Sequence, residues 1–115
     1  MSTERMRRVN EAVREVLSDA FTHDLKDPRV GFVTVTDVKT SPDLRHARVY
    51  VSVLGDAAAI EGSLEGLRSA HGFLQGRVGT ELRLKNTPTL QFIHDDTAER
   101  AQRVEQLLHD VERLD

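Results

Sequence analysis

The sequence predicts a single α+β domain with the element order α-β-β-α-α-β-α. Two β-rich runs, 30–40 and 46–54, flank a Ser-Pro-Asp turn at 41–43, which is typical of a β-hairpin. Apolar residues recur at three- and four-residue spacing before and after that hairpin, which indicates helices. The length of 115 residues suits one hydrophobic core rather than two. We therefore expect one domain over residues 1–115.

The first helix is expected to begin at Ser2 or Thr3 and to end at His23. Its apolar residues form one stripe, which comprises Met6, Val9, Val13, Val16, Leu17 and Ala20. Charged residues lie off this stripe, as in a helix with one face on a core. Pro28 stops the helix, because the residue before a proline is pushed out of the α region.

The two strands of the hairpin differ in how clearly they alternate. The run 46–54 alternates apolar with polar residues, and its apolar residues are Ala47, Val49, Val51 and Val53. This is the pattern of a strand with one buried face. In the run 30–40, by contrast, apolar residues and threonines fall on both faces. The pattern therefore leaves open which side of that strand faces the core.

Two helical segments and a third strand are expected after the hairpin. Asp56 is a suitable N-cap for a helix whose apolar stripe comprises Ile60, Leu64 and Leu67. Gly72 interrupts the pattern before helical spacing resumes. This predicts a bent helix, or two short helices, ending before a turn at 86–88. Residues 89–94 then alternate as a strand.

A last helix follows, and we expect it to pack on the domain. Asp96 and Glu99 fit a capping box at its start. Its apolar stripe comprises Ala101, Val104, Leu107, Leu108 and Val111. Such a stripe normally faces a core. Segment 86–115 also carries seven acidic side chains against three basic ones, which disfavours contact with a polyanion.

Several classes of protein are not supported by the composition. The chain has no Cys, which excludes disulfides and thiolate metal sites. Its five histidines lack metal-site spacing, and no nucleophile elbow or P-loop is present. No apolar run approaches the roughly 20 residues that span a bilayer, and the charged N-terminus is unlike a signal peptide. We expect a cytoplasmic, non-enzymatic protein without cofactor, metal or membrane association.

The charge is unevenly distributed along the chain. The formal net charge is −3, yet residues 67–85 carry one acidic side chain and four basic ones, which are Arg68, Arg77, Arg83 and Lys85. Polyanion binding depends on the local field of a patch more than on net charge. Arginine outnumbers lysine by 13 to 3, which favours bidentate phosphate contacts, although a GC-rich genome would give the same bias.

A bend between two helices is a candidate phosphate site. Backbone N–H groups at the N-terminus of the second helix favour phosphate, and KH domains use a GxxG loop there. Segment 69–72 (Ser-Ala-His-Gly) lies at the expected junction, whereas segment 76–79 matches GxxG literally but lies within apolar helical spacing. We prefer 69–72 on position. The alternative for Gly72 is a packing kink without a ligand.

Seven short motifs follow one another along the chain. They are Arg8-Val9-Asn10-Glu11, Asp27-Pro28-Arg29-Val30-Gly31, Val33-Thr34-Val35-Thr36, Ser41-Pro42-Asp43-Leu44, Ala47-Arg48-Val49-Tyr50-Val51-Ser52, Ala70-His71-Gly72 and Pro88-Thr89-Leu90-Gln91-Phe92. No single motif is decisive, but the ordered set resembles the ribosome-binding factor A family, which are bacterial assembly factors of the small ribosomal subunit. The resemblance spans essentially the whole chain.

The resemblance implies a fold and a function. The fold is a type II KH-like domain with a three-stranded sheet, helices on one face, and an Ala-x-Gly kink at 70–72 in place of GxxG. The function is binding to the free small (30S) subunit and its 16S rRNA, with support of late maturation, including processing of the 5′ end of 16S rRNA, and of growth at low temperature. Ribosomal proteins and an assembly GTPase are further implied partners, and we expect a monomer.

The expected RNA-binding residues combine the kink with the basic side chains. They are Arg7, Arg8, Arg45, Arg48, Arg68, Ala70, His71, Gly72, Arg77, Arg83 and Lys85. The chain has few aromatic residues, so we expect contacts with backbone and shape and little base stacking. Gln75 stands where family members often carry Arg. The alternative is a KH-like protein-interaction module that docks a ribosomal protein or an assembly GTPase without direct RNA recognition.

Overall fold

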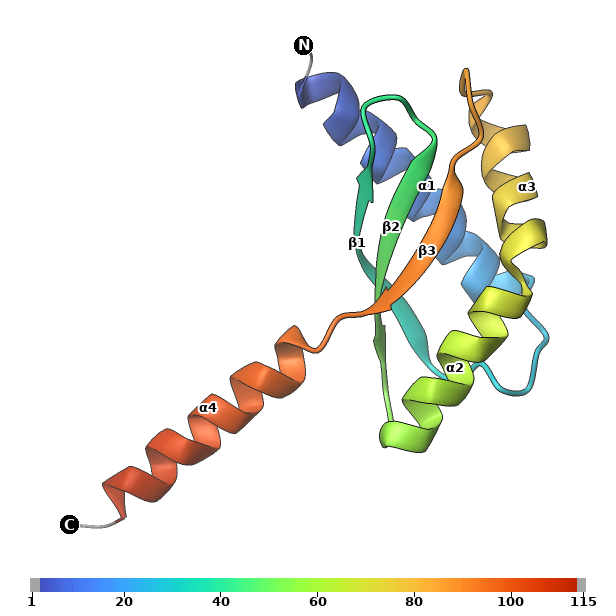
Figure 1. The fold of residues 1–115 in the computed structure, drawn as a ribbon. Coiled ribbons are helices and arrows are strands. Elements are labelled where there is room, and N and C mark those ends of the chain that lie inside the picture. Colours follow the sequence, from blue (N-terminus) through green and yellow to red (C-terminus); the bar gives the residue numbers. More distant parts are fainter. Residues whose placement is uncertain (1–2, 114–115) are drawn as a thin grey trace.

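The computed structural model describes residues 3–113 and confirms the expected order of elements (Figure 1). The elements are α1 (Thr3–His23), β1 (Val33–Thr40), β2 (His46–Val53), α2 (Ala57–Ser69), α3 (His71–Leu82), β3 (Thr89–His94) and α4 (Thr97–Glu112). The first strand begins three residues later than its β-rich run. The expected helix start at Ser2 lies outside the described residues.

The three strands form one mixed sheet in the order β1-β2-β3. The central strand β2 runs antiparallel to β1 and parallel to β3, with Val49 opposite both Val38 and Phe92. Inward-facing side chains of all three strands join apolar residues of α1, α2 and α3 in one buried cluster. Helices α1–α3 therefore cover one face of the sheet, as expected, and leave the other face open (Figure 1). Whether this arrangement is KH-like stays a prediction.

A bulge in β1 explains why its sequence pattern was ambiguous. The pairing register with β2 shifts between Val35 and Asp37, so Thr36 is an extra residue on the outer face. Val35 and Val38 are both buried, at 3% and 2% exposure, although three positions separate them. After a one-residue bulge, the core-facing positions of a strand change from odd-numbered to even-numbered residues or the reverse. A search for strict two-residue alternation cannot detect this change.

The α2–α3 segment consists of two helices that meet at Ala70. The Asp56 carboxylate caps α2 by accepting a hydrogen bond from the Ala59 N–H at 2.9 Å, as expected. Ala70 is the C-cap of α2 and also the N-cap of α3. Its N–H donates to the carbonyl of Gly66 and its own carbonyl accepts from the N–H of Leu74, both at 3.0 Å. The bend therefore lies in segment 69–72, and segment 76–79 lies inside α3.

The loop before β1 packs closely on α2. The Ser63 hydroxyl is buried and accepts a hydrogen bond from the Gly31 N–H at 3.1 Å. Gly66 is also buried, and a Cβ atom at this position would lie 2.5 Å from Cγ2 of Val30. The small residues of α2 thus leave room for the loop of residues 27–31.

The expectation that α4 packs on the domain is wrong. None of its residues is buried, and its large apolar side chains are 55–64% exposed. Only residues 95 and 96 separate α4 from β3, and the helix projects away from the sheet (Figure 1). The capping box also does not form, because Asp96 makes no side-chain cap hydrogen bond. The Asp95 carboxylate instead accepts a hydrogen bond from the Thr97 N–H at 2.9 Å.

Candidate functional site

Two loops distant in sequence lie side by side at one end of the molecule. The Asn86 side chain donates to the carbonyl of Asp43 at 3.1 Å, and the Thr89 N–H donates to the carbonyl of Arg45 at 2.8 Å. The N-terminus of α1 lies at the same end (Figure 1). We call this region the cationic end, and its basic residues are Arg7, Arg8, Lys39, Arg45, Arg48, Arg83 and Lys85.

The β1–β2 turn has an internal hydrogen-bond network. The Asp43 carboxylate accepts hydrogen bonds from the Ser41 hydroxyl at 2.6 Å and from the Arg45 N–H at 3.0 Å. These two donors lower the pKa of Asp43. Leu44 is buried and adopts the left-handed conformation, with φ of 62°. Asp43 therefore serves mainly the turn backbone, and the Arg45 side chain stays 69% exposed, 3.9 Å from that carboxylate.

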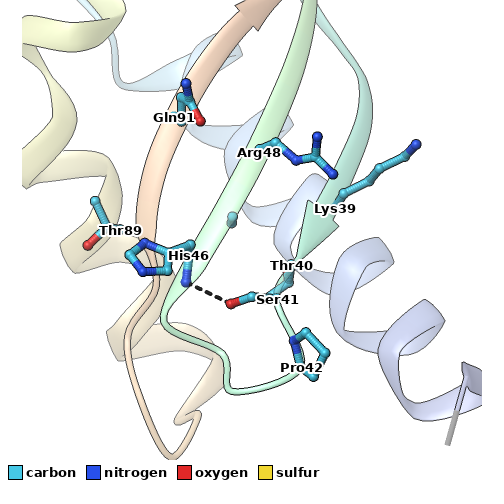
Figure 2. A pocket seen from close by; sticks show the side chains of 9 residues that line it. Lys39, Thr40, Ser41, Pro42, His46, Arg48, Thr89 and Gln91 are labelled. Carbon is cyan, nitrogen blue, oxygen red and sulfur yellow. Dashed lines mark hydrogen bonds between the residues drawn. The ribbon is translucent and has the colours of Figure 1, made fainter.

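A cleft opens beside this turn on the uncovered face of the sheet (Figure 2). It has a volume of about 660 Å³ and is lined by Lys39, Thr40, Ser41, Pro42, His46, Ala47, Arg48, Thr89 and Gln91. A second hollow of about 340 Å³ shares His46 and Thr89 with it and adds Arg45. A third hollow shares Thr87 with the second and extends along α3 to Gly72. The cleft and the α2–α3 bend are thus connected along the surface.

The sheet register brings two basic side chains together in this cleft. Lys39 and Arg48 are directly opposite each other on β1 and β2 (Figure 2). Within the described range 3–113, Arg48 makes no ion pair, whereas Arg7, Arg29 and Arg100 each pair with a carboxylate. Unpaired cations side by side on an exposed surface attract an anion. Sequence analysis missed Lys39, because the bulge hides which residues of β1 share a face with Arg48.

The bend residues are placed differently from the expected phosphate loop. His71 accepts a hydrogen bond from the Leu90 N–H through its Nε2 atom at 3.1 Å, so its ring joins α3 to β3. Gly72 is exposed, and a Cβ atom there would meet nothing within 4 Å. Ala70 makes only backbone cap hydrogen bonds among the described residues. The bend therefore offers one open glycine next to a histidine that is already engaged.

Two further expected arginines lie away from the cationic end. Arg77 on α3 pairs with Asp24 and lies 3.3 Å from Asp19 on α1 and 3.5 Å from Glu81. Its side chain is 24% exposed, and the hydrogen bond to Asp24 raises its pKa. This placement favours a structural role. Arg68 is exposed in the last turn of α2, near the bend.

No cluster of three or more metal-binding side chains occurs in residues 3–113. No helix within the described range has the length and hydrophobicity required to cross a bilayer.

Known proteins are similar to this chain in both sequence and fold. A family model described as ribosome-binding factor A matches residues 5–108. The solution structure of a Thermotoga maritima protein described as a ribosome binding factor A is 32% identical, with a TM-score of 0.74, and the match covers 84% of this chain and 92% of that chain. The crystal structure of ribosome-binding factor A from Thermus thermophilus is 26% identical, with a TM-score of 0.69, over 77% of this chain and 94% of that chain.

A third similar structure concerns a complex. It is a homology model of the Thermus thermophilus ribosome binding factor A, fitted into a cryo-electron microscopy map of a complex with the 30S subunit. It is 27% identical, with a TM-score of 0.63, and the match covers 75% of this chain and 90% of that chain.

Proposed function

Because the chain belongs to the ribosome-binding factor A family, we propose that it binds the free small (30S) ribosomal subunit through its cationic end. It acts there as a binding protein rather than an enzyme, in the cytoplasm and as a monomer. The role is support of late maturation, including processing of the 5′ end of 16S rRNA and growth at low temperature. The 30S complex described for a similar Thermus protein supports the choice of partner.

The observation that carries the proposal is the convergence of basic side chains from four segments. The N-terminus of α1, the facing strands β1 and β2, their turn, and the α3–β3 loop all contribute to the cationic end. RNA presents closely spaced phosphates, and neutralising them releases counterions. A surface of exposed arginines suits such a ligand, because guanidinium groups pair with phosphate in a bidentate geometry.

Charge reversal tests the proposal. We expect Arg45→Glu/Arg48→Glu to weaken cosedimentation with purified 30S subunits and to flatten its salt dependence. The slope of log K against log salt is negative, and its magnitude should decrease by roughly 1.4 to 1.8, because each lost phosphate contact removes about 0.7 to 0.9. The thermal midpoint should stay nearly unchanged, because both side chains are exposed.

The matched control reverses two arginines at the opposite end of the molecule. Arg103→Glu/Arg113→Glu makes the same charge change at exposed positions on and just after α4. It should leave both the affinity and the slope close to those of the wild type. Equal effects of the two double variants would refute a role for the cationic end.

A second candidate function is protein docking without direct RNA recognition. It is favoured by α4, where four large apolar side chains are exposed in one stripe, namely Val104, Leu107, Leu108 and Val111. A ribosomal protein or an assembly GTPase would then cover this stripe. A comparison of binding to protein-free 16S rRNA and to assembled subunits distinguishes the two functions. Binding to protein-free 16S rRNA supports the cationic end, whereas binding to assembled subunits alone supports docking.

A further inference from the structure

The outer face of the central strand carries a row of polar and aromatic side chains. On β2, Ala47, Val49 and Val51 point into the core, and the residues between them point outward. These outward residues are His46, Arg48, Tyr50 and Ser52. Helices α1–α3 all pack on the opposite face, and no residue of α4 is buried. Of this row, His46 and Arg48 are exposed and Tyr50 and Ser52 are half-buried, so each side chain can be reached at least in part from solution.

Charge is graded along this face. Lys39 and Arg48 lie at the end next to the β1–β2 turn. Toward the other end, Asp37 is opposite Tyr50, and the Asp95 carboxylate accepts a hydrogen bond from the Thr36 hydroxyl at 2.7 Å. Hydrogen bonds from Thr97 and Thr36 lower the pKa of Asp95 to about 2, so this carboxylate is ionised at neutral pH. A polyanion is attracted at the turn end and repelled at the other.

We propose that this face binds one unpaired RNA nucleotide, with its phosphate between Lys39 and Arg48 and its base stacked on the ring of Tyr50. The inference rests on the proposed binding to the small subunit and specifies its RNA as locally single-stranded. Arg48 and Tyr50 are two residues apart on β2, so their Cα atoms are roughly 7 Å apart, comparable with the reach from a phosphate to its own base. Exposed aromatic rings on a sheet face are a sequence-tolerant platform for stacking.

The cleft would receive the phosphate end of the nucleotide, because Lys39 and Arg48 line it and Tyr50 lies outside its lining. Its volume of about 660 Å³ falls in the range of small-ligand pockets, and the β1–β2 turn bounds it at one end (Figure 2). The ammonium group of Lys39 lies 5.9 Å from the centroid of the Tyr50 ring. It must turn toward the incoming phosphate before a base can stack. The flexible lysine side chain allows this movement, and it couples phosphate binding to stacking.

The composition of the chain makes stacking directly measurable. Tyr50 is the only tyrosine, and the chain has no tryptophan, so intrinsic fluorescence reports on this ring alone. The probe is a single-stranded oligoadenylate of roughly six nucleotides, compared with a short RNA duplex of the same charge. We expect the single strand to reduce Tyr50 emission in a saturable way, and the duplex to bind at least tenfold more weakly.

Variants distinguish the contribution of the Tyr50 ring to binding from that of the Lys39 and Arg48 charges. Tyr50→Leu should weaken binding of a labelled oligoadenylate about tenfold by fluorescence anisotropy, because base stacking is lost. Tyr50→Phe keeps the ring and should bind like the wild type. Lys39→Gln/Arg48→Gln should weaken binding and reduce its salt dependence. Thermal denaturation of each variant establishes that the fold is intact.

The inference is overturned if Tyr50→Leu binds the oligoadenylate as tightly as Tyr50→Phe. It is also overturned if the duplex binds equally well, or if binding leaves Tyr50 emission unchanged. Cosedimentation of the same variants with 30S subunits keeps the two proposals distinguishable. If oligoadenylate does not bind but the wild type cosediments in a salt-dependent way, only the nucleotide site fails. If the wild type does not cosediment at all, the proposed function fails.

Discussion

Replacing Gly66 by alanine should destabilise the fold, although alanine is the better helix former. A Cβ atom at this position would lie 2.5 Å from Cγ2 of Val30, 3.5 Å from Cγ of Asp27 and 3.6 Å from Cβ of Arg29. At the first of these distances either the Val30 side chain or the loop of residues 27–31 must shift on α2. Overpacking of this kind costs about 1–3 kcal/mol, and the gain in helix propensity offsets about 1 kcal/mol of it.

Gly76→Ala provides the matched control. Gly76 lies inside α3, and a Cβ atom there would meet nothing within 4 Å. This variant receives the same propensity gain without the clash, so it should be stabilised by up to about 1 kcal/mol. The difference between the two variants therefore isolates the clash at Gly66. It should be about 1–3 kcal/mol in free energy of unfolding.

Urea and thermal denaturation followed by circular dichroism measure this difference. For a domain of this size, about 1 kcal/mol corresponds to a midpoint shift of roughly 4 °C or more. If Gly66→Ala were as stable as Gly76→Ala, the loop of residues 27–31 would not pack on α2 as described. The same control also tests function. If Gly76→Ala keeps the wild-type stability but loses affinity for the 30S subunit, the hollow along α3 is part of the binding surface.

Two other predictions concern charged side chains. Arg77→Met should lower the thermal midpoint, because it removes the contacts of α3 with Asp19 on α1 and with Asp24 just after α1, while the salt slope of 30S binding stays unchanged. A flatter slope at full stability would return Arg77 to the RNA-binding set. For Asp95, hydrogen bonds hold the folded-state pKa at about 2, below the ordinary 3.8. The stability it contributes is present above about pH 3.8 and is lost as the pH falls toward 2. Denaturation between pH 4 and 2 should therefore be less pH-dependent in Asp95→Asn than in the wild type, and parallel curves would contradict this.

The element order was predictable because each element carries a local signal. The period-two pattern of β2, the stripe of α1 and the cap at Asp56 depend on residues close together in sequence, and the structure confirms all three. The placement of α4 was not predictable in this way. An apolar stripe shows that a helix has one face to cover, but not whether this chain or another molecule covers it. The stripe alone therefore led to the wrong expectation.

The candidate site was predictable only in part, for a related reason. Arg45 and Arg48 stood out because they adjoin an obvious turn. Lys39 and Tyr50 join them through strand register, which depends on a one-residue bulge that the sequence pattern does not locate. Conversely, Arg77 belonged to a basic segment of the sequence, but the fold surrounds it with the carboxylates of Asp19, Asp24 and Glu81. The net charge of a segment reflects residues that are adjacent in the sequence, whereas a ligand interacts with residues that are adjacent in the folded structure.

The spatial separation of charge resolves the conflict between an acidic chain and an RNA partner. The net charge of −3 averages two regions that lie far apart, since α4 projects from the end of the sheet opposite the β1–β2 turn (Figure 1). The molecule is 60 Å long, while charges are screened within about 8 Å at physiological ionic strength. The acidic residues of segment 86–115 that lie on α4 therefore do not weaken the field at the cationic end. They instead disfavour RNA contact at the other end, so in the proposed complex the charge gradient would orient the molecule on the RNA surface.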